Sequence, residues 1–291
     1  MIQYKRKKGS EILSNCELIT SENELKSLEE IERSLQKKFR PKLWSPFIKA
    51  LKEFNMVQDG DKIAVAISGG KDSLLLAKLF QELKRISDTK FEVVFISMNP
   101  GFNEINSKRL DKNLKHLNIP CIRYEDNIFE IAEKMAKDYP CYLCAKMRRG
   151  SLYTMAEKLG CNKLALGHHF DDVIETTLIN MFYAGEFKTM MPKLRSQNFD
   201  IELIRPLYYV REKDIKKFTN YNGLNPMNCG CVVSAGKTSS KRREVKELIA
   251  SLELKDKDIK AKIFNSVRNI NLNQCISWKK GKETYHFLDD Y

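Results

Sequence analysis

Short apolar runs alternate with longer amphipathic segments through the middle of the chain. The apolar run at 62–68 shows no polar alternation, which is typical of a strand buried on both faces, and further predicted strands lie at 91–98, 121–125 and 163–169. One segment with helical periodicity follows each of these runs except the third, which two such segments follow. These segments are 72–86, 103–117, 128–137, 145–160 and 171–185. The alternation predicts βαβ units, and therefore an α/β fold with a doubly wound parallel sheet.

The pattern differs on both sides of this region. Helical periodicity marks residues 21–39, where Ser21 and Glu24 have the spacing of a capping box, and also marks 41–57. Beyond residue 190 the alternation of strand and helix patterns stops. The expected elements there are an extended segment at 201–210, a helix at 211–221, a loop at 222–231 and helices at 241–253 and 257–267. We expect a helical N-terminal segment (1–58), a central α/β domain (59–190) and a C-terminal extension (191–291).

Composition limits the possible classes of protein. The 291 residues carry a net charge of +13, and the mean hydropathy is −0.45. No apolar stretch of about 18 residues predicts a membrane span, and the basic start is not followed by the apolar region of a secretory signal. We therefore expect a cytoplasmic protein that has no membrane partner. The positive charge fits a lysine-rich solvated surface or a polyanionic partner such as nucleic acid, and alone it does not choose between them.

A glycine-containing polar stretch, "SGGKDS", follows the first predicted strand and opens a helix. In open parallel sheets, ligands bind at this edge. Glycines let the backbone approach an anion, and the N–H groups of a helix N-terminus attract it. In this setting the two serines would donate hydroxyl hydrogen bonds, the lysine would add a positive charge, and the aspartate would hold Mg²⁺ beside a phosphate chain. The spacing is not that of a Walker A loop; a glycine turn that only connects strand and helix is the alternative.

This stretch resembles the PP-loop of the N-type ATP pyrophosphatase family. The resemblance implies the adenine-nucleotide alpha-hydrolase fold and an enzyme that splits ATP between its α and β phosphates. It also implies nucleotide-binding residues. Those implied at the phosphates are Ser68, Gly69, Gly70, Lys71, Asp72 and Ser73, those near the adenine are Ser97 or Met98, and the one flanking the nucleotide is Gly167.

Eight cysteines are present, and without a secretory signal we expect their thiols to be free, catalytic or metal-bound. Four stand alone and are interpreted as small buried or surface residues: Cys16, Cys121, Cys161 and Cys275. The others form two close pairs, Cys141 with Cys144 and Cys229 with Cys231. Such pairs suit zinc, an iron–sulfur cluster or a redox disulfide. Four thiolates would complete a zinc site, whereas three would leave one iron of a cluster open.

A wider series of motifs is similar to the tRNA 2-thiocytidine biosynthesis family, over about residues 40–250. It comprises "PCYLC", "GHHFDD", "NMFYAG", "MPKL" and "RPL". The resemblance implies a [4Fe-4S] cluster on three cysteines, ATP with Mg²⁺, and sulfur transfer to a tRNA cytidine. Cys141 and Cys144 match two ligands. The later pair departs from the family's Cys-x-x-Cys by one residue, so the third ligand, Cys229 or Cys231, and the exact substrate stay open, with Cys229 favoured.

Other polar residues allow a functional and a structural interpretation. Asp172, at the start of a helix, is a candidate near metal or substrate, and His168 is a candidate near the nucleotide. Packing is the alternative for the pair His168 and His169. Asp171 has the position of a helix N-cap. Lys146 and Arg148 follow the first cysteine pair and are candidates for stabilising charge on the ATP phosphates or the adenylate. The aromatic residues of 180–187 predict core packing, with base stacking as the alternative.

The function expected from this resemblance is ATP-dependent thiolation of a tRNA cytidine through an adenylated intermediate. It also implies a sulfur donor of the cysteine desulfurase kind, and a homodimer. One alternative is a PP-loop sulfur transferase that acts on uridine or a small molecule. Another is a non-catalytic RNA-binding protein stabilised by zinc.

Overall fold

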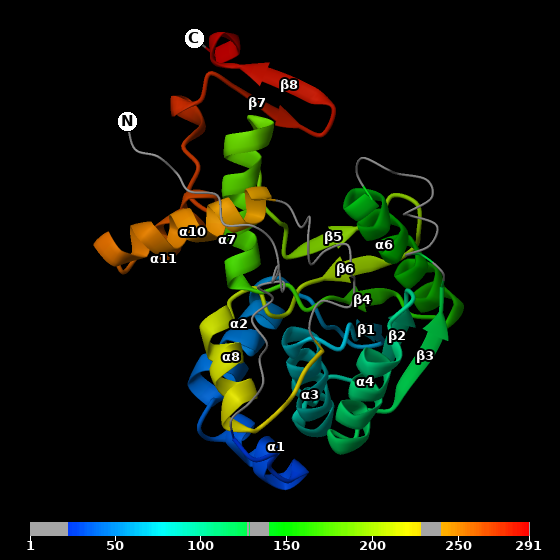
Figure 1. Ribbon diagram of the computed structural model, residues 1–291. Coiled ribbons are helices and arrows are strands. Elements are labelled where there is room, and N and C mark those ends of the chain that lie inside the picture. Colours follow the sequence, from blue (N-terminus) through cyan, green and yellow to red (C-terminus); the bar gives the residue numbers. More distant parts are fainter. Residues whose placement is uncertain (1–22, 127, 129–139, 228–239, 291) are drawn as a thin grey trace, which may run out of the picture. The chain divides into compact units, whose positions relative to one another are not determined.

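A computed structural model describes residues 23–126, 128, 140–227 and 240–290 (Figure 1). They form two compact units, each assembled from two stretches of the chain. The first unit takes its described residues from Met1–Phe170 and Pro192–Ser239, and the second from Asp171–Met191 and Ser240–Tyr291. The helix that follows Phe170 therefore packs with the C-terminal part of the chain, whereas the predicted domain 59–190 groups it with the sheet.

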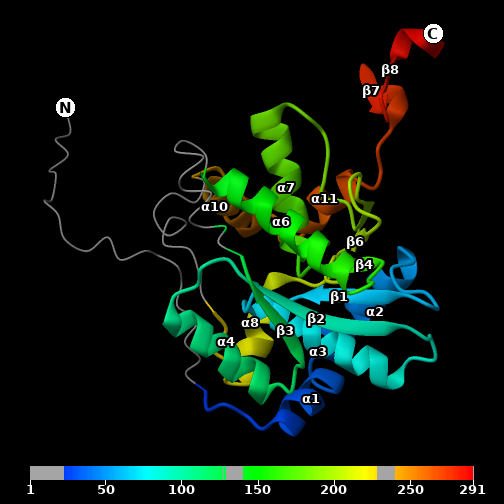
Figure 2. The ribbon, with the colours of Figure 1, turned by 90° about the vertical axis from the view of Figure 1, so that its right-hand side faces the viewer.

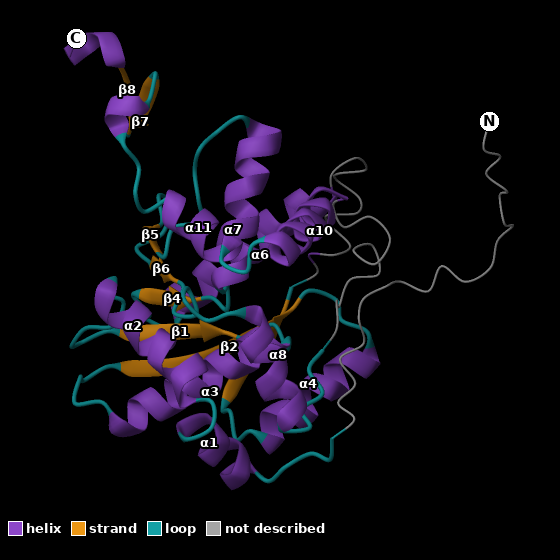
Figure 3. Ribbon diagram, turned by 90° about the vertical axis from the view of Figure 1, so that its left-hand side faces the viewer, coloured by secondary structure: helices purple, strands orange, loops and turns teal. Residues whose placement is uncertain are grey.

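The first unit is built around a six-stranded sheet with the order β3-β2-β1-β4-β6-β5, coloured orange in Figure 3. Neighbouring strands are parallel except β5, which pairs antiparallel with β6 at one edge. The predicted doubly wound parallel sheet is confirmed, and β5 is an addition that the sequence pattern did not reveal. The strands are β1 (Lys62–Ala66), β2 (Glu92–Asn99), β3 (Cys121–Glu125), β4 (Lys163–Ala165), β5 (Lys193–Arg195) and β6 (Glu202–Ile204).

Helices cover both faces of this sheet (Figure 2). On one face, α6 packs over a buried cluster that includes Ala64, Ala66 and Leu203. Because successive strand residues point to opposite faces, the fully buried Ile63 and Val65 serve the other face, on which α3 packs. This double burial explains the continuous apolar run. The helices of the first unit are α1 (Leu28–Gln36), η1 (Arg40–Trp44), α2 (Ser45–Glu53), α3 (Lys71–Ile86), α4 (Glu104–His116), α6 (Pro140–Lys158) and α8 (Glu212–Tyr221). Of the predicted helix 128–137, all but residue 128 lies outside the described residues.

Two predicted strands are longer than the observed ones. The runs 62–68 and 163–169 leave the sheet after Ala66 and Ala165, and the residues that follow form loops at its carboxyl edge. The predicted extended segment 201–210 contains only the short β6. Its next residues form a turn around Pro206, which has no backbone N–H to continue the ladder.

The first helix begins later than its sequence pattern predicts. Ser27, not Ser21, is the N-cap of α1, and Ser27 and Glu30 form the capping box. Glu24 precedes the helix and has no regular structure. Ser21 lies outside the described residues, and of the two neighbouring Ser-x-x-Glu spacings it is the later one that forms the capping box of α1. The chain before α1 is instead held to a distant segment, as the Lys26 N–H donates to the carbonyl of Asn222 at 3.2 Å.

The predicted helix 41–57 is split into two elements. A π-helical stretch, η1, carries Pro41 in its first turn and leads directly into α2, which ends at Glu53. Asn55 then takes a left-handed φ of 47°, which stops the helix. Apolar side chains of both elements, Leu43 and Phe47 among them, are fully buried.

The second unit is mainly helical. Its buried side chains include Val173 and Ile174 of α7, Val245 and Ile249 of α10, and Phe264 of α11. The two C-terminal helices confirm the predicted ones, whereas the hairpin β7–β8, with Trp278 stacked on Tyr285, was not foreseen. Its elements are α7 (Phe170–Ile179, whose first residue belongs to the first unit), η2 (Asn180–Ala184), α10 (Ser240–Lys255), α11 (Ile259–Ser266), η3 (Leu272–Gln274), β7 (Ser277–Lys280), β8 (Glu283–His286) and η4 (Phe287–Asp290). Among the helices described in either unit, none is long and apolar enough to cross a membrane.

Candidate functional site

The loop between β1 and α3 has the geometry of an anion-binding turn. Gly69 has a φ of +83°, a conformation that glycine adopts without strain. Gly70 is the N-cap of α3, and no side chain caps that helix end. The N–H groups of the first turn are therefore left to bind an external acceptor, aided by the helix dipole.

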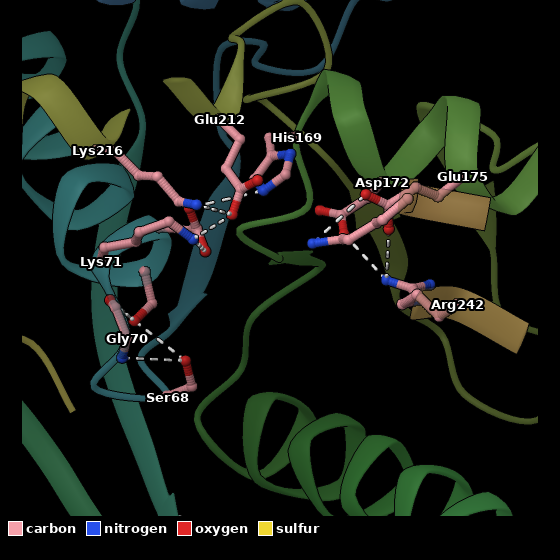
Figure 4. Close-up of polar contacts among 12 residues, drawn as sticks. Ser68, Gly70, Lys71, His169, Asp172, Glu175, Glu212, Lys216 and Arg242 are labelled. Atoms are coloured by element: carbon pink, nitrogen blue, oxygen red, sulfur yellow. Dashed lines mark hydrogen bonds and ion pairs between the residues drawn. The ribbon is translucent and has the colours of Figure 1, made fainter. Parts of the chain in front are cut away.

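The two serines of this loop fix its shape. The Ser73 hydroxyl donates to the Gly70 carbonyl at 2.9 Å, and the Ser68 hydroxyl donates to Ser73 Oγ at 3.2 Å. The Gly70 N–H in turn points to Ser68 Oγ at 3.5 Å (Figure 4). Both hydroxyls thus hold the loop closed on itself before any ligand is present.

Charged side chains gather where α3 begins. Lys71 Nζ lies 3.1 Å from Asp72 Oδ2 and 3.1 Å from Oε1 of Glu212, the first residue of α8 (Figure 4). Burial lowers the Lys71 pKa, but these two carboxylates outweigh it and raise the pKa overall, so Lys71 stays charged. His169, which is buried, brings Nε2 to 3.8 Å from Asp72 Oδ1.

Asp72 has the oxygen chemistry that Mg²⁺ prefers. Its Oδ1 is buried and accepts no hydrogen bond from the described residues. A buried carboxylate oxygen that accepts no hydrogen bond is costly unless a cation or donor arrives with the ligand. The residue therefore fits the predicted role of metal ligand, which stays a prediction.

The residues predicted around the nucleoside lie on neighbouring strand ends. Gly167 approaches the start of α3 closely, because a Cβ there would lie 3.3 Å from the backbone N of Ser73. Ser97 and Met98, near the end of β2, are both buried, and the Ser97 hydroxyl has no hydrogen-bond partner among the described residues. Their contact with adenine stays a prediction.

The first cysteine pair lies in the first turns of α6. Positions 141 and 144 are three residues apart and so share a helix face, on which Ser151 follows two turns later. The Ser151 hydroxyl reaches Tyr124 Oη at 3.5 Å, which ties this face to the end of β3. Because α6 connects parallel strands, it starts at the carboxyl edge of the sheet, the edge of the Gly69 loop.

The basic residues after this pair lie on different faces of α6. Arg148 is four residues from Cys144 and shares its face, whereas Lys146 lies on the opposite side and is exposed. The geometry thus favours Arg148 over Lys146 as the cation beside the cysteine pair. Their catalytic roles stay predictions.

The second cysteine pair, Cys229 and Cys231, lies outside the described residues. The chain that leads to it is anchored on the loop, because the Met227 N–H donates to the Gly69 carbonyl at 2.8 Å. Within the described part of the chain, no cluster of three or more metal-ligating side chains occurs. Any three-cysteine site would therefore include at least one ligand from outside the described residues.

Asp171 and Asp172 belong to the second unit, where both are ion-paired. Asp172 Oδ1 lies 3.2 Å from Arg242 Nη1, which is also 3.5 Å from the buried carboxylate of Glu175 (Figure 4). Asp171 pairs with Lys260 at 3.4 Å. Because α7 already begins at Phe170, Asp171 lies inside its first turn, and the predicted N-cap role was wrong. The pairs join α7 to α10 and α11, which favours the structural interpretation of Asp172; its catalytic role stays a prediction.

Comparison with known proteins agrees with this geometry. Residues 43–227 match the family model described as PP-loop domain. The chain is 36% identical over 225 residues to the tRNA-cytidine(32) 2-sulfurtransferase of Citrifermentans bemidjiense, with 77% of this chain and 88% of that protein covered. The chain belongs to the tRNA 2-thiocytidine biosynthesis family of PP-loop proteins. Its similarity to a second member, the tRNA-cytidine(32) 2-sulfurtransferase of Geotalea daltonii, is 37% identity over 82% of this chain and 94% of that protein.

A solved structure shares the fold of this PP-loop family member. It is the U34-tRNA thiolase NcsA from Methanococcus maripaludis with its [4Fe-4S] cluster, at a TM-score of 0.63 and 22% sequence identity. The similarity covers 79% of this chain and 80% of that chain. At this identity it supports the fold and no residue-level role.

The sequence expectation of core packing for the aromatic segment 180–187 was wrong. The residues 180–187 were expected to pack in the core, yet Met181, Phe182, Tyr183 and Phe187 are between 41% and 53% exposed. The segment continues α7 as η2 and ends at Gly185, whose φ is +64°. Apolar composition alone predicted burial, but the fold leaves this helix end uncovered by the described residues.

Two residues at the PP-loop were missed by sequence reasoning. Glu212 pairs with Lys71, and Met227 packs on Gly69, where a Cβ would lie 2.3 Å from Met227 Sδ. Both lie far from the loop in the sequence. Their only signals were the "REKD" start of a predicted helix and the position of Met227 just before the second cysteine pair.

Proposed function

We propose that this chain is an ATP-dependent tRNA sulfurtransferase that forms 2-thiocytidine in tRNA. The observation that carries the proposal is the combination of a PP-loop and a cysteine pair at one edge of the sheet, in a chain 36–38% identical to tRNA-cytidine(32) 2-sulfurtransferases. The net charge of +13 is consistent with a tRNA partner.

The PP-loop would bind ATP. Backbone N–H groups at Gly69, Gly70 and the first turn of α3 would hold the phosphates, with the Lys71 ammonium close by. Asp72 would hold Mg²⁺, which neutralises charge on the departing pyrophosphate. In the activation step, the C2 oxygen of the cytidine bonds to the α-phosphorus and the bond to pyrophosphate breaks.

Sulfur would then replace the activated oxygen. A sulfide supplied by a donor attacks C2, the C–O bond breaks, and AMP leaves with that oxygen. The Arg148 guanidinium, on the face of α6 that carries the cysteine pair, would stabilise the charge on the adenylate. A [4Fe-4S] cluster, when bound, would supply an open iron to which the sulfide can coordinate.

The residues present fit such a cluster in part. Cys141 and Cys144 offer two thiolates within one helical turn, and a third would come from Cys229 or Cys231. Both lie outside the described residues, and Cys229 is the third ligand that we favour. Met227, two residues before it, donates its N–H to the Gly69 carbonyl of the PP-loop.

The activity is tested by deleting the gene and measuring tRNA nucleosides by mass spectrometry. We expect 2-thiocytidine to disappear and to return with the wild-type gene. Unchanged 2-thiocytidine would remove the proposed substrate. Loss of 2-thiouridine instead would point to a uridine thiolase.

The metal is tested by preparing the protein without oxygen and measuring iron, sulfide and zinc. We expect about four irons per chain, and we expect Cys144→Ala to lose them while its circular dichroism stays unchanged. Cys161→Ala is the matched control, since Cys161 is buried in the sheet core and should keep the iron. A colourless wild-type protein with one zinc per chain would contradict the cluster.

A further inference from the structure

The PP-loop lysine is held between two carboxylates from different parts of the chain. Its ammonium is 3.1 Å from Asp72 Oδ2, on the next residue of α3, and 3.1 Å from Glu212 Oε1, at the start of α8. The Lys71 side chain is only 13% exposed, and that of Glu212 only 20%. The helices α3 and α8 pack together, so Glu212 reaches Lys71 from a rigid element.

This arrangement leaves one donor of the ammonium for a ligand. A lysine ammonium has three N–H donors, and Asp72 and Glu212 accept two of them. No other acceptor contacts Lys71 within the described residues. With two donors engaged, the direction of the third N–H is fixed relative to these two carboxylates, and Lys71 itself is the first residue of α3.

Fixing the lysine matters because its side chain is flexible. A lysine side chain has about four rotatable bonds, and ordering it costs conformational entropy when it binds a ligand. Asp72 is adjacent to Lys71 in the sequence and belongs to the same helix. Glu212 belongs to another helix and can hold the ammonium relative to the loop.

We propose that Glu212 is a positioning residue, which orders the Lys71 ammonium for contact with a phosphate of ATP. The inference rests on the proposed function, in which this loop binds ATP. Glu212 does not touch the nucleotide in this proposal and acts through Lys71.

The test measures binding of a non-cleavable ATP analogue with Mg²⁺ by calorimetry, without tRNA. We expect Glu212→Gln to raise Kd about tenfold, by analogy with the loss of outer-shell residues that orient metal ligands, and Glu212→Asp to recover part of the loss. The direction of the change in Kd distinguishes the proposal from simple charge repulsion between Glu212 and the phosphates. Removing a negative charge near the phosphates would otherwise tighten binding, so unchanged or tighter binding by Glu212→Gln would overturn the proposal.

A second lysine–glutamate pair on the same helix is the matched control. Lys78, seven residues after Lys71 on α3, pairs with Glu32 at 2.6 Å and is even more buried. We expect Glu32→Gln to lower the melting temperature and to leave Kd within twofold of wild type. An equal rise in Kd for Glu32→Gln would mean that Glu212 acts only through stability, and would overturn the proposal.

A double-mutant cycle with Lys71→Ala shows whether Glu212 acts through Lys71. We expect Glu212→Gln to have no further effect on Kd once Lys71 is alanine. Additive effects would overturn the positioning role. A wild-type chain that binds no analogue would instead overturn the proposed function, and this role with it.

Discussion

The conformation of the PP-loop requires a residue without a side chain at Gly69. The residue combines a left-handed φ of +83° with a contact to Met227, whose Sδ lies 2.3 Å from the place a Cβ would take. We predict that Gly69→Ala costs about 2–4 kcal/mol of stability, from backbone strain and overpacking together. It should also abolish binding of the ATP analogue. Urea unfolding and calorimetry measure the two effects.

Gly60 provides the control for Gly69. Its φ is +84°, but a Cβ added there would have no atom within 4 Å. Gly60→Ala should therefore cost only the backbone strain, about 1–2 kcal/mol, and leave nucleotide binding intact. Equal losses for the two variants would show that contact with Met227 is unimportant. Adding Met227→Ala to Gly69→Ala should recover part of the stability.

Cys121 should be an unreactive thiol at neutral pH. Burial raises its pKa to about 12, with Arg123 opposing and Asp111 adding to the shift. Because the folded pKa is above the ordinary thiol value, the folded state holds a proton that the unfolded state loses. Stability from this group is present below about pH 9 and is lost as pH rises toward 12.

We predict that alkylation of Cys121 by iodoacetamide rises about tenfold per pH unit between pH 8 and 11. A rate that levels off near pH 9 would contradict the shift.

At the scale of elements, α8 combines contact with the PP-loop and a basic outer face. Lys213 and Lys217 are exposed, lie one turn apart, and share a stripe with Asn220 that carries no carboxylate. At the end of the helix, Lys26 and Lys38 lie over the ring of Tyr221 at 3.1 and 3.5 Å. The fold thus joins lysines that are far apart in the sequence along one helix.

If tRNA binds as proposed, this stripe is suited to contact its phosphates. We predict that Lys213→Ala with Lys217→Ala weakens tRNA binding and lowers the slope of log K against log salt by about one to two. Lys112→Ala with Lys115→Ala on α4, also exposed, is the matched control. An equal effect of the two pairs on the slope would indicate net charge alone. Binding of the ATP analogue should stay unchanged in both.

Elements with a strong local pattern could be predicted from the sequence, and those set by distant contacts could not. The buried strands and their crossover helices follow from periodicity, which is why the sheet was expected. Two Ser-x-x-Glu spacings made the start of α1 ambiguous. The helix begins after the later one, at Ser27, and the residue before it, Lys26, is hydrogen-bonded to the distant Asn222. The edge strand β5 is only three residues long and carries no usable period.

The same distinction holds for the candidate site. Ser68 to Ser73 are contiguous, so their loop could be recognised from sequence. The partners of that loop, Glu212 and Met227, come from beyond the sheet and needed the fold to identify them. The exposure of Phe182 and Tyr183 could not be foreseen either, because periodicity reports an apolar face and not what covers it.

For the whole molecule, the second unit should depend on α10 and tolerate loss of the hairpin. Glu175 is 3% exposed and pairs with Arg242 and Lys246 of α10. A chain that ends at Ser239 would leave this carboxylate without its α10 cations, which is strongly destabilising when the charge stays buried. We predict that this chain aggregates, whereas one that ends at Arg268 stays folded and binds the ATP analogue. Circular dichroism and gel filtration check both, and a stable monodisperse chain ending at Ser239 would contradict the prediction.

The interleaving of the two units has a consequence for synthesis on the ribosome. Helix α7 emerges early, but its partners α10 and α11 follow only after the strands β5 and β6 and helix α8. At 5–20 residues per second, the wait between Glu175 and Arg242 is on the order of 3–13 s. During that interval the apolar side of α7 has no α10 to cover it, so we expect the nascent chain to expose an apolar segment of the kind that chaperones bind.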